Sequence, residues 1–254
     1  MKKEFDIFRT AIMFFTRIPA GNIKNYKPEY VNSCSKYLPI IGYFIGAVSG
    51  GAFLLFNLIL PIPVSILLAM AIQVLLTGAF HEDGFCDVCD GVGGGWGVER
   101  ILEIMKDSRI GAFGAIGIIF MILLKFVTLS ETLIFNIFTS LFLGSIFSRG
   151  FTVLFMRYST YVRADESSKS KPVTKQLGFF DFLVALFFTV IPLFFFDLRI
   201  IIAMLISLVA YLIFKKYIEK QLGGYTGDCL GAMQQVTELF FYIGMCINYG
   251  NLFN

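Results

Sequence analysis

The chain has 254 residues, of which 57% are hydrophobic and only 15% are charged. Soluble domains carry about 25% charged residues, so this composition excludes an ordinary soluble protein and predicts an all-α protein embedded in a lipid bilayer. The net charge of +3 is small and gives no indication of a nucleic-acid partner.

The N-terminal residues predict a helix on the membrane surface rather than a signal peptide. Lys2 and Lys3 resemble the start of a signal sequence, but Asp6, Arg9 and Arg17 interrupt the apolar stretch that should follow. Residues 5–18 therefore predict a short amphipathic helix at the interface.

Seven apolar stretches predict membrane-spanning helices, which need about 20 residues each. They lie at about 37–60, 64–80, 111–129, 132–156, 179–196, 199–214 and 233–250. The count falls to six if the last two are partly interfacial. Residues 1–254 are expected to form a single integral-membrane domain.

The polar segments alternate with the spans so that all of them fall on one side of the membrane. Segments 1–36, 81–110, 157–178 and 215–232 contain 18 of the 21 Lys and Arg residues. The positive-inside rule then places this side in the cytoplasm. We expect a multi-pass protein of the cell membrane with its active site on the cytoplasmic face.

Three aspartates form the clearest chemical motif. Asp83, Asp87 and Asp90 are four and three residues apart, so a helix would place them on one face within about 60°. Such carboxylates repel one another unless a cation lies among them, and hard oxygen ligands favour Mg²⁺. We expect them to bind magnesium, with Glu82 and Asp228 completing the ligand set. The alternative is a solvated acidic helix face.

A glycine cluster follows the aspartates. The glycines at 91 and 93–95 are expected to end the helix and to let backbone N–H groups approach an anion, although a plain helix stop fits equally well. A second glycine-rich loop lies at 220–231 on the same side. Candidate substrate-binding residues of these polar segments are Gly93, Gly94, Gly224, Thr226 and the only histidine, His81.

Basic residues lie at the C-terminal end of a predicted interfacial helix at 98–107, in which apolar residues recur at helical spacing. This helix carries Lys106 and Arg109 to the edge of the third span. Two cations beside a carboxylate cluster fit a di- or triphosphate ligand, so both are candidate catalytic residues. The alternative is that these basic side chains anchor the protein to the membrane surface.

Ionisable residues also occur inside or beside the spans. Arg149 lies within the fourth span, where burial requires a partner, and is a candidate substrate-binding residue. Asp228 is expected to complete a metal shell or to pair with Arg149. Lys125 lies near the far end of the third span, where snorkelling is sufficient to explain it. Glu238 fits either a similar role or a structural salt bridge.

The chain resembles the cobalamin synthase family, adenosylcobinamide-GDP ribazoletransferase, in motifs that run in order along nearly its whole length. They are FFTRIP (14–19), YLPIIGYFIG (37–46), TGAFHEDGFCDVCDGVGGG (77–95), LEIMKDSRIGAFG (102–114), SRG (148–150) and LGGYTGDCLGA (222–232). Cys86 and Cys89 stand where the family usually has small residues, which indicates that they are spacers rather than ligands.

The resemblance implies a reaction that residue spacing alone does not reveal. The family joins α-ribazole, or its 5′-phosphate, to adenosylcobinamide-GDP, forms the cobalamin or its 5′-phosphate, and releases GMP, with magnesium as the expected metal. Combined with the residues above, it predicts that the aspartates hold magnesium against the pyrophosphate. Lys106, Arg109 and Arg149 would neutralise the departing GMP, and Asp90 would accept the proton of the attacking ribose hydroxyl.

Two other functions compete with this prediction. A CDP-alcohol phosphotransferase also uses spaced aspartates at a membrane face, but the D-G-x-x-A-R spacing is absent after Asp83-Gly84. A transporter would place Arg149 and Lys125 on a translocation path and would need polar residues in several spans. The sequence does not indicate the oligomeric state.

Overall fold

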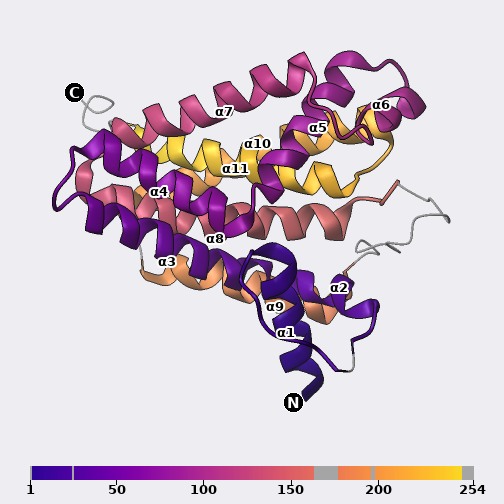
Figure 1. The fold of residues 1–254 in the computed structure, drawn as a ribbon, viewed down its shortest axis with the longest axis horizontal. Helices are drawn as coiled ribbons and strands as arrows, with labels where there is room; N and C mark the ends of the chain where they lie inside the picture. The colour runs from indigo at the N-terminus through magenta and orange to yellow at the C-terminus, as the bar shows by residue number, and fades with distance from the viewer. Residues whose placement is uncertain (1, 25, 163–176, 196–197, 248–254) are drawn as a thin grey trace.

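The computed structural model describes residues 2–24, 26–162, 177–195 and 198–247, and within these ranges the ordered elements are helices (Figure 1). The prediction of an all-α fold is confirmed. The α-helices are α1 (Lys2–Phe15), α2 (Glu29–Ser33), α3 (Leu38–Phe56), α4 (Ile62–Thr77), α5 (Phe80–Gly94), α6 (Val98–Ile104), α7 (Ala112–Ser130), α8 (Ile134–Tyr158), α9 (Phe179–Val190), α10 (Leu198–Leu222) and α11 (Gly227–Cys246). Two 3₁₀ helices, η1 (Cys34–Tyr37) and η2 (Ile191–Phe195), complete the order.

Each predicted span corresponds to a helix, but the count of seven is not confirmed. Four helical segments among the described residues are long and apolar enough to cross a membrane: Glu29–Phe56, α7, α8 and α10. The α4–α5 pair adds a fifth if it is one span, although the two helices meet at 88°. The apolar helix Phe179–Phe194 is shorter, and α11, which carries Gln234, Gln235 and Glu238, does not belong to this set.

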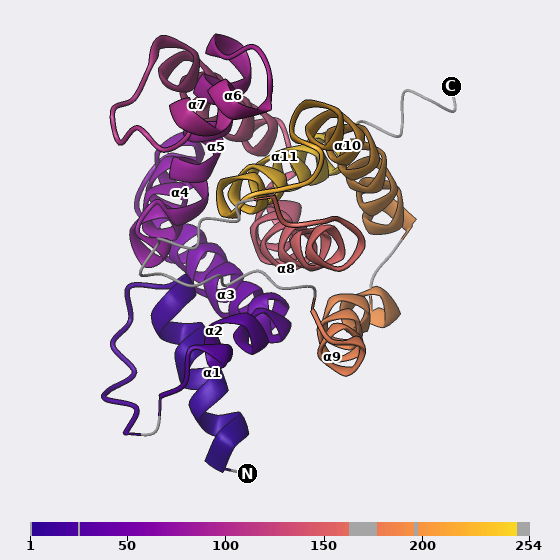
Figure 2. The ribbon, with the colours of Figure 1, turned by 90° about the vertical axis from the view of Figure 1, so that its right-hand side faces the viewer.

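The long helices lie side by side along the long axis, with α8 and α11 at the centre of the bundle (Figures 1 and 2). Small residues allow the backbones to approach closely. A Cβ on Gly42 of α3 would lie 2.6 Å from the carbonyl oxygen of Ser145 in α8, and one on Gly244 of α11 would lie 2.5 Å from Cα of Ala203 in α10. Close packing of this kind drives helix association where lipid removes the hydrophobic effect.

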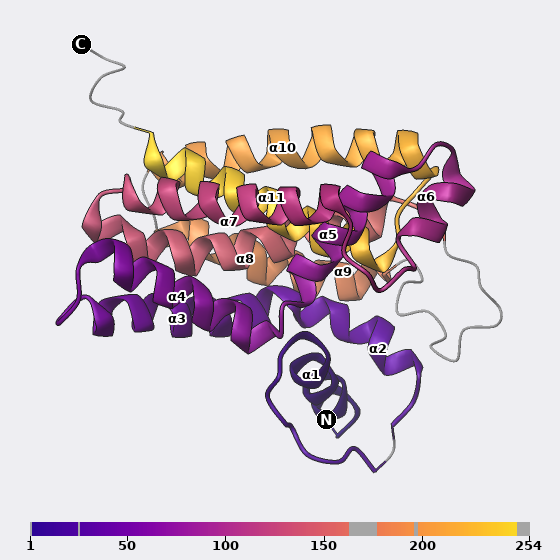
Figure 3. The ribbon, with the colours of Figure 1, turned by 45° about the horizontal axis from the view of Figure 1, so that its top comes forward.

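Helix α1 lies to one side of the bundle, next to α2, and is seen nearly end-on in Figure 3; it confirms that the N-terminal residues form an amphipathic helix. Its buried side chains include Ile7, Ala11 and Phe15. The Nζ atom of Lys36, in η1, lies 2.8 Å from Glu4 Oε2 and 2.9 Å from Asp181 Oδ1. This cation therefore joins α1 to the start of α9. The Lys36 hydrogen bond lowers the pKa of Glu4, although partial burial opposes the shift.

Candidate active site

The candidate site begins at a sharp bend between α4 and α5. Gly78 and Ala79 have φ values of +68° and +57°, and Ala79 is the one non-glycine residue with positive φ in the described part of the chain. Left-handed backbone is costly for alanine, and such strain persists only where the surrounding structure enforces it. The bend redirects the chain so that α5, which carries Asp83, Asp87 and Asp90, crosses α11.

Two glycines set how closely α5 and α11 cross. A Cβ on Gly84 would lie 2.7 Å from the backbone oxygen of Asp228, and a Cβ on Gly231 would lie 2.9 Å from the backbone oxygen of His81. Contacts this short require a glycine at each position. The crossing brings the backbone of Asp228, in the first turn of α11, against the helix that carries Asp83 and Asp87.

The carboxylates at this crossing fit magnesium chemistry, but they do not form a complete cage. Asp83 is exposed and Asp87 and Asp228 are half-buried. In the described residues, no group of three His, Cys, Asp or Glu side chains is arranged to hold a metal ion. Magnesium typically needs only one or two carboxylates, because waters and substrate phosphates supply its other ligands. Asp83 and Asp87, one helical turn apart, meet that requirement.

Asp90 makes contacts that its spacing did not predict. Its Oδ2 accepts a hydrogen bond from the Gly111 backbone N–H at 2.7 Å, and its Oδ1 accepts one from Gly114 N–H at 2.8 Å. Asp90 therefore caps the N-terminus of α7, where a carboxylate also interacts favourably with the helix dipole. Its predicted roles as a metal ligand and proton acceptor stay predictions.

The prediction that the glycines at 91 and 93–95 end the helix is confirmed at the end of the cluster, because α5 stops at Gly94 with Gly95 as its C-cap. Helix α5 continues through Gly91 and Gly93 to Gly94. A Cβ on Gly91 would lie 2.5 Å from the Met105 side chain, and one on Gly93 would lie 2.5 Å from the ring of Phe113. These glycines therefore allow α6 and α7 to pack against α5. A role for Gly93 and Gly94 in binding substrate stays a prediction.

The basic residues after α6 lie at the surface. The predicted helix at 98–107 is confirmed in its first two turns, as α6. Lys106 and Arg109 are exposed. The Arg109 guanidinium forms an ion pair with Asp107 at 2.6 Å, and this hydrogen bonding lowers the pKa of Asp107 to about 2. Arg109 therefore has an anion beside it with which a phosphate would compete.

Glu82 joins the site to a buried polar network inside the bundle. Its Oε1 accepts a hydrogen bond from Gln235 at 2.9 Å, and Gln235 in turn accepts one from Lys125 at 2.6 Å. Lys125 also forms an ion pair with Glu238 at 2.6 Å, and Gln73 donates to Glu238 at 2.8 Å. The structural salt bridge considered for Glu238 is confirmed. The prediction that Lys125 snorkels to the membrane surface is wrong, because its side chain points into the bundle and pairs with Glu238.

Arg149 lies deep in the same interior region. It is 1% exposed, and its Nη1 donates to the Ser145 carbonyl at 2.8 Å. Arg149 Nε and Glu82 Oε2 are buried without a hydrogen-bond partner among the described residues. Buried polar atoms are normally hydrogen-bonded, so both are open to a water molecule or a substrate group. A cavity of about 30 Å³ beside Glu82 has room for one water.

The remaining predicted substrate-binding residues are buried. His81 is 3% exposed, and its ring lies edge-on to Phe80. A Cβ on Gly224 would overlap the Thr160 carbonyl oxygen. The Thr226 hydroxyl caps α11 by accepting a hydrogen bond from Cys229 N–H at 3.4 Å. Gly224 and Thr226 therefore fix the start of α11, and direct substrate contacts for these residues stay predictions.

Sequence reasoning missed Gln73 and Gln235, which connect Glu82 to Glu238. The available signal was Gln73, an amide in the otherwise largely apolar helix α4, together with the polar cluster of α11 in which Gln235 follows Gln234 and precedes Glu238. A lone amide in a membrane helix needs a buried partner, but the sequence cannot indicate which partner it finds.

The Gly84 contact leads to a test of the crossing. We expect Gly84→Ala to destabilise the protein by about 1–3 kcal/mol through overpacking, and to lower activity because α5 and Asp228 must separate. Gly51→Ala is the matched control: it also lies within a helix, but its Cβ would meet no atom within 4 Å. This control should be neutral or stabilising by about 0.5–1 kcal/mol. Equal unfolding temperatures in detergent for the two variants would contradict the close crossing.

Comparisons with known proteins agree with this arrangement. Residues 7–246 match the family model described as cobalamin-5-phosphate synthase. Proteins named adenosylcobinamide-GDP ribazoletransferase from Leptospira interrogans and Shewanella amazonensis are 40% and 39% identical to this chain. The alignments cover 99% of both chains in the first case and 95% of both in the second. No solved structure matches the chain significantly. The chain belongs to the cobalamin-5-phosphate synthase family.

Proposed function

We propose that this chain is an adenosylcobinamide-GDP ribazoletransferase. It joins α-ribazole, or its 5′-phosphate, to adenosylcobinamide-GDP and forms adenosylcobalamin, or its 5′-phosphate. A ribose hydroxyl oxygen bonds to the phosphorus that carries cobinamide, the bond from this phosphorus to the GMP oxygen breaks, and the hydroxyl proton leaves. The observation that carries this proposal is the likeness to relatives with this name over nearly the whole chain.

We propose that Asp83 and Asp87 hold magnesium against the pyrophosphate, with Asp228 beside them. Magnesium, when bound, polarises the phosphoryl oxygens and offsets their negative charge. The hard oxygen donors on the outer face of α5 support this assignment. Glu82 supports the site from inside through Gln235, and Asp90 supports it by holding the start of α7.

The basic residues supply positive charge to the leaving group in this proposal. Lys106 and Arg109 lie on an exposed segment where they can reach a large nucleotide substrate. Phosphoryl transfer depends mainly on positioning and electrostatic stabilisation, which these side chains provide. Arg149 has a buried Nε without a partner in the described part of the chain, and this supports a polar substrate contact there.

We propose that the protein lies in the cell membrane and that its active site is on the cytoplasmic side. The polar segments that carry Asp83, Asp87 and Asp228 belong to the set that contains 18 of the 21 Lys and Arg residues. Positively charged loops remain on the cytoplasmic side during insertion, which supports this orientation.

The reaction is tested with the purified full chain in proteoliposomes. Adenosylcobinamide-GDP, α-ribazole 5′-phosphate and Mg²⁺ are added, and released GMP and the corrin product are quantified. We expect equal amounts of both, and we expect a chelator to stop release until excess Mg²⁺ restores it. Absence of GMP in the complete mixture would reject the proposed reaction. Chelator-resistant release would reject only the role of magnesium.

A further inference from the structure

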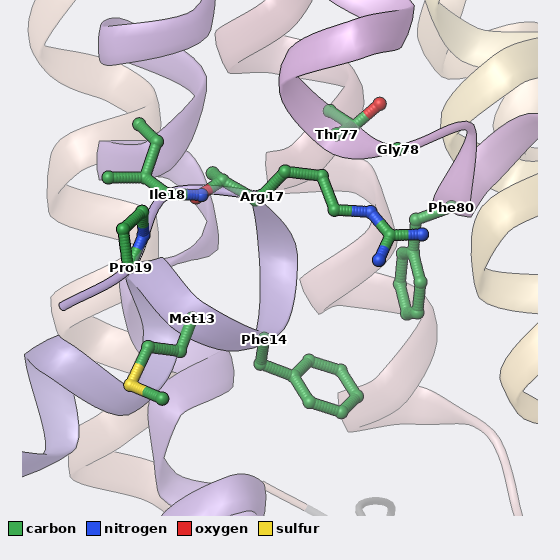
Figure 4. A pocket seen from close by; sticks show the side chains of 9 residues that line it. Met13, Phe14, Arg17, Ile18, Pro19, Thr77, Gly78 and Phe80 are labelled. Carbon is green, nitrogen blue, oxygen red and sulfur yellow. The ribbon is translucent and has the colours of Figure 1, made fainter. Parts of the chain in front are cut away.

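A second cavity lies at the α4–α5 bend, apart from the carboxylates described above. Its volume is about 390 Å³, and it is lined by residues of α1, the following segment 16–19 and the bend. Figure 4 shows the Arg17 side chain extended toward Gly78 and Phe80, with the Phe14 ring nearby. A cavity of this size accommodates a small organic ligand.

Arg17 is held by its backbone, while its charged group remains available. Its backbone N–H donates to the Leu76 carbonyl at 2.7 Å, and the neighbouring Thr16 hydroxyl accepts from Ile18 N–H at 3.1 Å. Across the described residues, the Arg17 guanidinium has no hydrogen-bond or ion-pair partner. An arginine without a partner in a cavity is suited to bind a phosphate, because its planar fork matches two phosphate oxygens.

The bend is shaped around this arginine. A Cβ on Gly78 would overlap Arg17 Nε, so glycine is required both for the left-handed backbone and for the path of the arginine side chain. Helix α5 also starts at this point without a side-chain N-cap. The positive end of its dipole therefore adds to the attraction of the Arg17 charge for an anion.

Aromatic side chains line the same cavity. Phe80 is 42% exposed, and its ring packs edge-on against Phe14 with centroids 5.4 Å apart. Phe14 fixes the orientation of Phe80 and leaves part of that ring open. Exposed aromatic faces bind flat heterocycles by stacking. The cavity thus combines a cation for a phosphate with a ring for an aromatic base.

The cavity and the carboxylates share one face of α5. Phe80, Asp83 and Asp87 are related by three and seven residues, which places them in one stripe along the helix. At 1.5 Å per residue, the two aspartates lie roughly 5 and 10 Å beyond Phe80 along the helix axis. A ligand that extends from the cavity along this stripe would therefore reach Asp83 and Asp87.

We infer that this cavity binds the nucleotide acceptor, α-ribazole 5′-phosphate, with its phosphate on Arg17 and its base against Phe80. The inference rests on the proposed function and deepens it. The family description names a cobalamin 5-phosphate as product, so this phosphate does not react and needs a binding site separate from the pyrophosphate. The Arg17 cavity supplies that site.

The test compares two acceptors that differ only in the phosphate. We expect Arg17→Gln to raise the KM for α-ribazole 5′-phosphate about 10- to 100-fold, the loss typical of a hydrogen-bonded charge. The KM for unphosphorylated α-ribazole should change less than twofold, because that acceptor has no charge for Arg17. Arg17→Lys should give an intermediate KM for the phosphorylated acceptor. Lys24→Gln, an exposed basic residue near Arg17 in sequence, is the matched control and should affect neither KM.

An equal rise in both KM values, or no rise, would overturn the inference. Direct titration of α-ribazole 5′-phosphate without adenosylcobinamide-GDP separates this failure from failure of the reaction. If wild-type protein turns over but its binding of α-ribazole 5′-phosphate does not depend on Arg17, the cavity assignment fails while the proposed function stands. If wild-type protein releases no GMP, the proposed function itself fails, and with it the inference.

A lipid headgroup also presents a phosphate, so the assay is run in two nanodisc compositions. One contains phosphatidylcholine alone, and the other adds phosphatidylglycerol. The same Arg17-dependent KM in both supports the nucleotide acceptor. An effect of Arg17→Gln confined to phosphatidylglycerol discs would assign the cavity to lipid and overturn the inference.

Discussion

Asp87→Asn and Asp83→Asn are each expected to lower GMP release by about 10²- to 10³-fold, the range seen when one group that stabilises transition-state charge is removed. Asparagine keeps the size of the side chain but loses the negative charge with which we propose that each aspartate binds magnesium. The measurement is the initial rate of GMP release at saturating substrates, together with its dependence on Mg²⁺ concentration. The variants should need more Mg²⁺ to reach their maximal rate.

Glu99→Gln is the matched control for these variants. Glu99 is an exposed carboxylate in the first turn of α6, close in sequence to the site. It should retain the wild-type rate and the wild-type Mg²⁺ dependence. Wild-type rates in both aspartate variants would contradict the magnesium site on α5. If Glu99→Gln lowered the rate of GMP release by as much, the effect would not be specific to the face of α5 that carries Asp83 and Asp87.

Lys125→Met is expected to destabilise the protein by about 3–5 kcal/mol, because it leaves the Glu238 carboxylate buried without its cation. Lys125 and Glu238 are 2.6 Å apart, and their side chains are 7% and 1% exposed. The double variant Lys125→Met/Glu238→Gln removes both charges and should recover much of this loss. Unfolding temperature in detergent is the measurement.

Lys216→Met provides the comparison for that pair. Lys216 is exposed on α10, so the same substitution removes a charge without leaving a buried partner. Its unfolding temperature should remain near that of the wild type. If the double variant were less stable than Lys125→Met, the cost would arise from lost packing or hydrogen bonds instead of the unpaired carboxylate.

The spans were predictable where local composition determines the structure. The stretches predicted at 111–129 and 132–156 correspond to α7 and α8 within about two residues at each end. Long apolar runs form helices in lipid because the backbone must satisfy its own hydrogen bonds there. The number of spans was less predictable, since α4 is followed by an 88° bend and α9 is short.

The sequence allowed us to predict which residues lie at the site better than which residues they contact. The stripe of Asp83 and Asp87 follows directly from helical spacing. Asp90 lies in the same stripe, yet its carboxylate binds the backbone of Gly111 and Gly114. That contact depends on where α7 begins relative to α5, which no local pattern encodes. The glycines after Asp90 were correctly predicted to end α5, but the packing of Met105 against Gly91 and of Phe113 against Gly93 was not predictable for the same reason.

The buried Lys125–Glu238 pair also constrains how the protein is made. The two residues are 113 positions apart in the chain. At about 5–20 residues per second, the ribosome reaches Glu238 roughly 6–23 s after Lys125. During that interval the newly inserted α7 holds a lysine without its counter-ion, which lipid tolerates poorly. Biogenesis therefore requires that α7 remain beside the translocation machinery, or keep Lys125 near water, until α11 is synthesised.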